Sequence, residues 1–92
     1  MRHLVDGKLF DTESAQLLLS CRTLYQQYDY YKTTLGNFVQ VNTPASEFRG
    51  EGNACVPVKC QVISEAMMRS ILSSHDMDKY EEVFGVDDVE ML

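Results

Sequence analysis

The chain has 92 residues, a net charge of −6 and a hydrophobic fraction of 45%. That length supports one modest core and that composition argues against disorder, so we expect a single domain over residues 1–92. No apolar run approaches the roughly 18 residues of a membrane-spanning helix, and the N-terminus has no apolar signal region, so we expect a cytoplasmic protein without a membrane partner.

The N-terminal residues predict a short hairpin, or a strand with a bulge, followed by a helix. Asp6-Gly7 tolerates the left-handed backbone of a tight turn, and short apolar segments flank it on both sides. Asp11 then has the character of a helix N-cap, with Glu13 in the first turn. We expect this helix to end near Cys21 and to cover a sheet.

Residues 23–42 predict the sheet itself, because they are rich in strand-forming residues and contain no helix-favouring run. Residues 33–37 supply a turn in which Gly36 can adopt positive φ. A further strand is expected within residues 54–62, with Pro57 confining it to an edge of the sheet. Between them, residues 43–53 have the composition of a loop.

Four tyrosines lie close together in the first part of this sheet. A period of two places Tyr28 and Tyr30 on one face, and Tyr25 and Tyr31 with Asp29 on the other. Two interpretations remain open. The tyrosines pack in the core and across strands, or they form an exposed aromatic surface for a partner, for which Tyr25 and Tyr31 are the candidates.

The last third of the chain predicts two helices. Ser64 caps the first, which is expected to run through Ser74 with one apolar stripe made of Met67, Met68, Ile71 and Leu72. Asp76 caps the second, shorter helix, and Gly85 is the residue expected just after its end. The fold class predicted is therefore α+β: a small antiparallel sheet of three to four strands covered by an N-terminal helix and two C-terminal helices.

The whole net charge lies in residues 76–92, because residues 1–75 contain seven acidic and seven basic side chains. Apolar residues alternate with these acids, which indicates a folded amphipathic end. Such a field attracts basic partners, although many acidic termini are only solvated surface. The candidate partner-binding acids are Asp76, Asp78, Glu81, Glu82, Asp87, Asp88 and Glu90.

The sequence offers little for catalysis or for metal and cofactor binding. Two histidines stand near element ends, no nucleophile motif is present, and Cys21, Cys55 and Cys60 match no zinc spacing. We expect three thiols, no metal, no cofactor and no enzymatic activity. A neutral body with an acidic end also argues against direct binding of nucleic acid.

Several short segments resemble small accessory proteins of bacterial phages and mobile elements. Residues 6–15 (DGKLFDTESA) resemble the turn, aromatic-Asp-Thr segment and helix with which such proteins open. The segments TLY at 23–25, GNF at 36–38 and KYEEVFG at 79–85 are also similar to theirs. The chain differs from them in a longer stretch at residues 26–31 and in the loop around Gly50.

Anti-CRISPR proteins are prominent among such accessory proteins, so the resemblance implies a non-enzymatic inhibitor in a bacterial host cell. We expect the acidic end to dock on the basic surface of a CRISPR effector, with a type I Cascade subunit as the first candidate, and to block target DNA binding. Two alternatives remain: a DNA-mimic inhibitor of another host defence or nuclease, and a non-catalytic structural or assembly accessory of a phage. The expected oligomeric state is a monomer or weak dimer.

Overall fold

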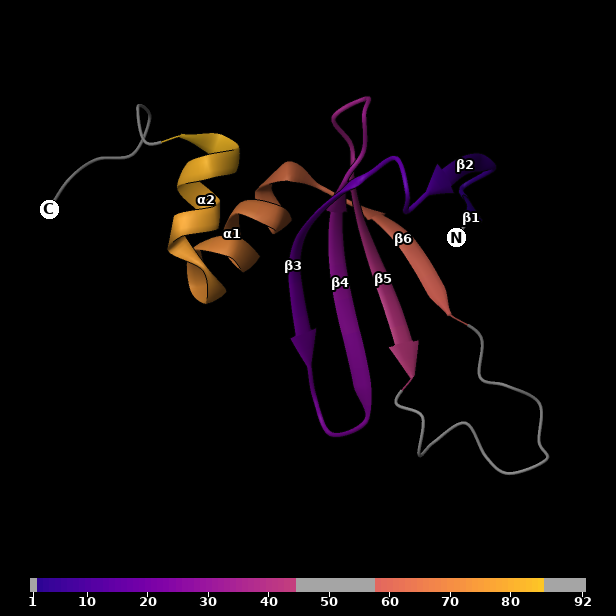
Figure 1. The fold of residues 1–92 in the computed structure, drawn as a ribbon, viewed down its shortest axis with the longest axis horizontal. Helices are drawn as coiled ribbons and strands as arrows, with labels where there is room; N and C mark the ends of the chain where they lie inside the picture. Colours follow the sequence, from indigo (N-terminus) through magenta and orange to yellow (C-terminus); the bar gives the residue numbers. More distant parts are fainter. Residues whose placement is uncertain (1, 45–57, 86–92) are drawn as a thin grey trace, which may run out of the picture.

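The computed structural model describes residues 2–44 and 58–85, and it has an α+β fold (Figure 1). A two-stranded sheet is followed by a four-stranded sheet and then by two helices. The elements are β1 (Arg2–Val5), β2 (Lys8–Asp11), β3 (Gln16–Arg22), β4 (Gln26–Lys32), β5 (Phe38–Pro44), β6 (Lys59–Ile63), α1 (Glu65–His75) and α2 (Met77–Phe84).

The N-terminal hairpin predicted around Asp6-Gly7 is confirmed. Both turn residues have positive φ, 52° for Asp6 and 76° for Gly7, as a two-residue turn of type I′ requires. Antiparallel pairing of β1 with β2 then places Val5 opposite Lys8 and Leu4 opposite Leu9.

The helix predicted after Asp11 is wrong, because β3 occupies residues 16–22. The capping chemistry is present but closes a turn: the Glu13 N–H donates to Asp11 Oδ1 at 3.0 Å, and the Ser14 N–H donates to the Asp11 carbonyl at 3.3 Å. A β-bulge between Leu17 and Leu19 interrupts the alternation of β3. This extra residue makes the leucine run resemble a helical pattern.

The second sheet is an antiparallel meander in the order β3-β4-β5-β6. The predicted turn at residues 33–37 is confirmed, with Gly36 at φ 86°. The last strand is shorter than the segment predicted, and it forms one edge of the sheet, as expected. The predicted role of Pro57 lies outside the described residues.

Both faces of this sheet carry buried side chains, as the alternation along β4 predicts. One cluster contains Tyr30 with Phe38 and Ile63 and packs against the helices. The opposite cluster joins Val39 and Val41 to the hairpin residues Val5 and Phe10, and includes the partly buried Tyr31.

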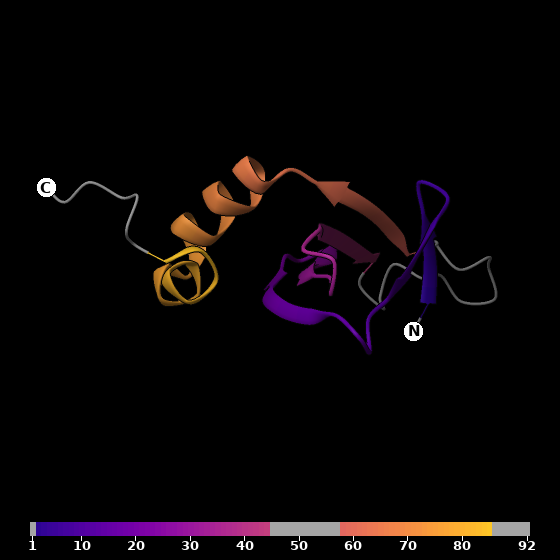
Figure 2. The same cartoon turned by 90° about the horizontal axis from the view of Figure 1, so that it is seen from above.

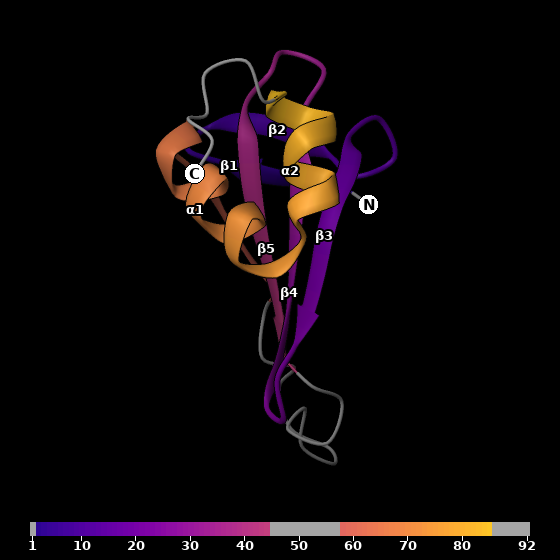
Figure 3. The same cartoon turned by 90° about the vertical axis from the view of Figure 1, so that its left-hand side faces the viewer.

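The chain therefore forms three layers. Figure 2 shows the helices on one side of the four-stranded sheet and the β1–β2 hairpin on the other. Figure 3 shows that α1 and α2 cover only the part of the sheet nearest the β4–β5 turn, while β1 and β2 cross behind the strands. The two small layers thus stand on opposite faces of one sheet.

Local signals specify both C-terminal helices. Ser64 caps α1 by accepting a hydrogen bond from the Met67 N–H, and Asp76 caps α2 by accepting one from the Lys79 N–H. Gly85 ends α2 with φ 76°. The predicted stripe is correct for Met68 and Leu72, which are fully buried, whereas Met67 is 47% exposed.

Candidate functional site

The acidic candidates that the structure describes lie on α2 or at its start. They differ in whether their carboxylates make hydrogen bonds or ion pairs within the protein. Asp76 is half-buried, and its Oδ1 accepts the Lys79 N–H at 3.1 Å, so its carboxylate helps to hold the helix together. The Lys79 ammonium in turn pairs with the Glu82 carboxylate at 2.9 Å. Asp78 and Glu81 are exposed, and within the described residues neither makes an ion pair.

The spacing of these acids puts three of them on one side of α2. Asp78, Glu81 and Glu82 are three and four residues apart, so their side chains are neighbours on the helix surface. We call these three residues the acidic face. The other three candidates, Asp87, Asp88 and Glu90, lie outside the described residues.

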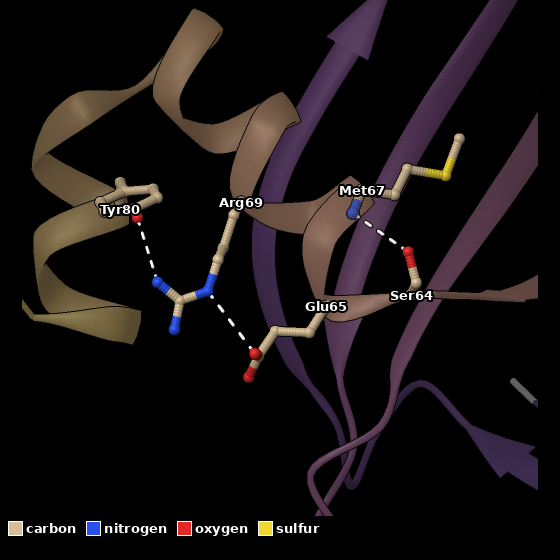
Figure 4. Close-up of polar contacts among 5 residues, drawn as sticks. All are labelled: Ser64, Glu65, Met67, Arg69 and Tyr80. Atoms are coloured by element: carbon tan, nitrogen blue, oxygen red, sulfur yellow. Dashed lines mark hydrogen bonds and ion pairs between the residues drawn. The ribbon is translucent and has the colours of Figure 1, made fainter. Parts of the chain in front are cut away.

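Arg69 of α1 fixes α2 against the rest of the protein (Figure 4). Its Nη1 donates to the Tyr80 hydroxyl at 3.1 Å, and its guanidinium carbon lies 4.4 Å from the centre of the Phe84 ring. On its other side, Nε lies 3.5 Å from a carboxylate oxygen of Glu65. One side chain of α1 therefore contacts two aromatic residues of α2 that are one helical turn apart.

Aromatic packing continues this contact to the sheet. The Phe84 ring lies 5.3 Å from that of Tyr80 and 5.6 Å from that of Phe38 on β5, measured between centroids. Tyr80 is only 8% exposed, and it packs in the same cluster as Leu72. The acidic face thus stands on a helix that is anchored at several points.

The two tyrosine candidates do not form one surface. Tyr25 is 55% exposed in the turn between β3 and β4, where its N–H donates to the Thr23 hydroxyl. Tyr31 lies near the other end of β4 and packs edge-on against Phe10, 5.5 Å between centroids. The prediction that both share a strand face is therefore wrong, because β4 begins only at Gln26 and Tyr25 lies in the turn before it.

The raised pKa values of Tyr31 and Cys60 predict a loss of stability at high pH. Burial, followed by the charges of Asp29 and Cys60, raises the pKa of Tyr31 above 10.0, and burial raises the pKa of Cys60 above 9.0. The unfolded chain loses these protons first, so the free energy of unfolding should fall as pH rises above about 9. Urea titrations across this range should show a shallower fall for Tyr31→Phe and Cys60→Ala than for the parent.

A polar depression of about 370 Å³ is lined by residues of β5 and β6, namely Gln40, Asn42, Lys59, Cys60 and Gln61. Its amides pair with one another: Gln61 Nε2 donates to Gln40 Oε1 at 2.7 Å, and Gln40 Nε2 donates to the Tyr30 hydroxyl at 2.9 Å. Cys60 also borders it, and burial raises the pKa of that thiol, which disfavours the reactive thiolate. Residues 2–44 and 58–85 contain no group of three metal-ligating side chains.

The outer side of the β1–β2 hairpin carries an apolar pair that is not among the residues predicted from the sequence to form a site. Leu4 and Leu9 are 77% and 65% exposed and lie directly opposite each other. The signal was present, because a two-residue turn at Asp6-Gly7 sets the register of the two strands.

No protein-family model matches the chain, and comparisons with curated proteins and with solved structures return no similar protein. Among the described residues, no helix is long and apolar enough to cross a membrane.

Proposed function

We propose that this chain is a non-catalytic inhibitor that docks the acidic face of α2 on a basic, nucleic-acid-binding surface of another protein. The observation that carries the proposal is the exposure of Asp78 and Glu81 on a helix held in place by Arg69. Fixed charges lose little conformational entropy on docking, and they attract an oppositely charged partner at long range.

The partner proposed is a CRISPR effector of a bacterial host, with a type I Cascade subunit as the first candidate. Such effectors hold nucleic acid in positively charged channels, so an acidic surface can occupy the place of the DNA backbone. The resemblance to phage and mobile-element accessory proteins supports the choice of partner. The charge on α2 supports only the weaker statement that the partner is basic.

The test is binding of the purified chain to purified effector complexes at low and high salt, with target DNA as competitor. We expect salt-sensitive binding that DNA displaces. The double variant Asp78→Lys, Glu81→Lys should weaken it by about tenfold or more, because like charges would face each other.

Asp78→Lys and Glu81→Lys are also made singly, and Glu13→Lys is the matched control for each of them, because it changes the net charge equally at an exposed position far from α2 in sequence. A second set of variants reverses Asp87, Asp88 and Glu90. Binding that is unchanged in every charge-reversal variant would contradict the proposal. The acidic end would then serve only as solvated surface that keeps the protein soluble.

A second function, a structural or assembly accessory of a phage, is favoured by a different observation. The apolar pair Leu4 and Leu9 on the outer side of the hairpin suits a salt-insensitive protein contact. A DNA-mimic inhibitor of another host defence or nuclease differs from the first proposal only in its partner, so binding assays with such proteins distinguish the two.

A further inference from the structure

The β1–β2 hairpin has two chemically different sides. Its inner side buries Val5 and Phe10, each 4% exposed, against the four-stranded sheet. Its outer side presents Leu4 and Leu9, and the next pair on that side, Arg2 opposite Asp11, is charged. We call these four outward residues the outer hairpin face.

Single exposed leucines are ordinary, but this pair forms one continuous apolar surface. The two residues are cross-strand partners, so their Cβ atoms are about 5 Å apart. The strands could carry polar residues here without any cost to the core, because Leu4 and Leu9 point away from it. Contiguous exposed apolar surface that is bordered by polar or charged residues is a feature of protein interaction sites.

The order of residues on this face is self-complementary. Two copies can stack with their outer hairpin faces against each other. A two-fold axis that lies between the two copies and runs parallel to the hairpin strands then relates one copy to the other. Such an axis places β1 of one copy over β2 of the other. Leu4 then meets Leu9 of the second copy, and Arg2 meets Asp11 of the second copy, so apolar residues face apolar ones and opposite charges face each other.

We propose that the outer hairpin face is a dimer interface whose occupant is the same face of a second copy of this chain. Among residues 2–44 and 58–85, the hairpin forms the outer layer on its side of the sheet, so for these residues the dimer has the layer order helices, sheet, hairpin, hairpin, sheet, helices. The acidic faces of α2 remain exposed at the two ends. The inference is independent of the function proposed for them.

Neighbouring residues extend the contact beyond the hairpin. Leu9 and Leu35 both line a depression of about 130 Å³ between the hairpin and the β4–β5 turn. Leu35 is 88% exposed, so it adds apolar surface at the margin. The face is still small beside standard interfaces, which bury about 800 Å² per partner, and we therefore expect a weak, concentration-dependent dimer.

Sedimentation equilibrium of the full chain over a wide concentration range tests the interface. Leu4→Ser and Leu9→Ser should each raise the dimer dissociation constant by about tenfold or more, since each removes a buried leucine from each copy. Leu24→Ser is the matched control: Leu24 is 70% exposed, in the β3–β4 turn, and its replacement should change nothing. A monomer at every concentration, or equal effects of all three variants, would overturn the proposal.

The charged pairs allow a second test that does not depend on the leucines. Arg2→Asp alone and Asp11→Arg alone each leave like charges on the outer hairpin face, so each variant should dimerise less than the parent. Asp11→Arg also removes the acceptor of the Glu13 N–H. Mixing the two variants should restore dimers, because each copy then meets its opposite charge. Circular dichroism shows whether each variant remains folded, and failure of the folded mixture to associate would contradict the two-fold arrangement.

Discussion

Leu72→Ala is expected to destabilise the protein by roughly 2–5 kcal/mol, the usual range for removal of a buried leucine side chain. Leu72 is fully buried where α1 packs against the sheet, in the cluster that also contains Tyr30 and Tyr80. The alanine leaves a cavity that rigid sheet residues on one side and α2 on the other cannot close. Urea denaturation followed by circular dichroism measures the loss.

The size of this effect matters because the whole domain is expected to be only modestly stable. The free energy of unfolding of small domains is about 5–15 kcal/mol, so the substitution removes a large share of it. The matched control is Leu35→Ala, at a leucine that is 88% exposed, where a change below about 0.5 kcal/mol is expected. Equal costs at both positions would contradict the packing of α1 on the sheet.

The elements that the sequence predicts correctly are those specified by neighbouring residues. Ser64, Asp76 and Gly85 delimit the C-terminal helices through bonds and dihedral angles within one turn, and Asp6-Gly7 does the same for the hairpin. The alternation along β4 is equally local, and it correctly assigns Tyr30 and Tyr31 to opposite faces.

The error at β3 has a non-local cause. Residues 16–22 carry three consecutive leucines, which are good helix formers, and they follow a residue with the character of an N-cap. The strand forms because β4 offers a complete antiparallel partner, with Leu17 opposite Tyr31 and Cys21 opposite Tyr28. Pairing across the sheet outweighs propensity here, and a bulge that hides the alternation cannot be recognised without the partner strand.

The candidate site likewise has local features that the sequence predicts and non-local contacts that it does not. Sequence spacing is enough to place Asp78 and Glu81 on one side of a helix. It does not reveal that Glu82 is paired with Lys79, or that Arg69 connects the two helices, because those contacts depend on side-chain geometry and on the angle between α1 and α2.

Arg69→Met is expected to cost roughly 1–3 kcal/mol of stability, because it keeps most of the apolar stem but removes a charged hydrogen bond and a cation–π contact. The hydrogen bond is to the Tyr80 hydroxyl and the ring is that of Phe84. Glu65→Gln removes only the ion pair, whose carboxylate is 64% exposed, and it should cost far less. A double-mutant cycle with Tyr80→Phe should give a coupling of about 1 kcal/mol, and additive costs would contradict the contact.

The variant Arg69→Met also distinguishes two contributions to binding, the fixed position of α2 and the negative charge of the chain. Arg69→Met makes the chain more negative, so electrostatic attraction alone predicts equal or tighter binding to a basic partner. If binding requires the acidic face to be held in place, affinity should instead fall several-fold, since the loosened helix must be ordered on docking. Faster amide exchange confined to α2 should accompany the loss. Binding as tight as the parent's would show that the negative charge acts without the fixed geometry that Arg69 supplies.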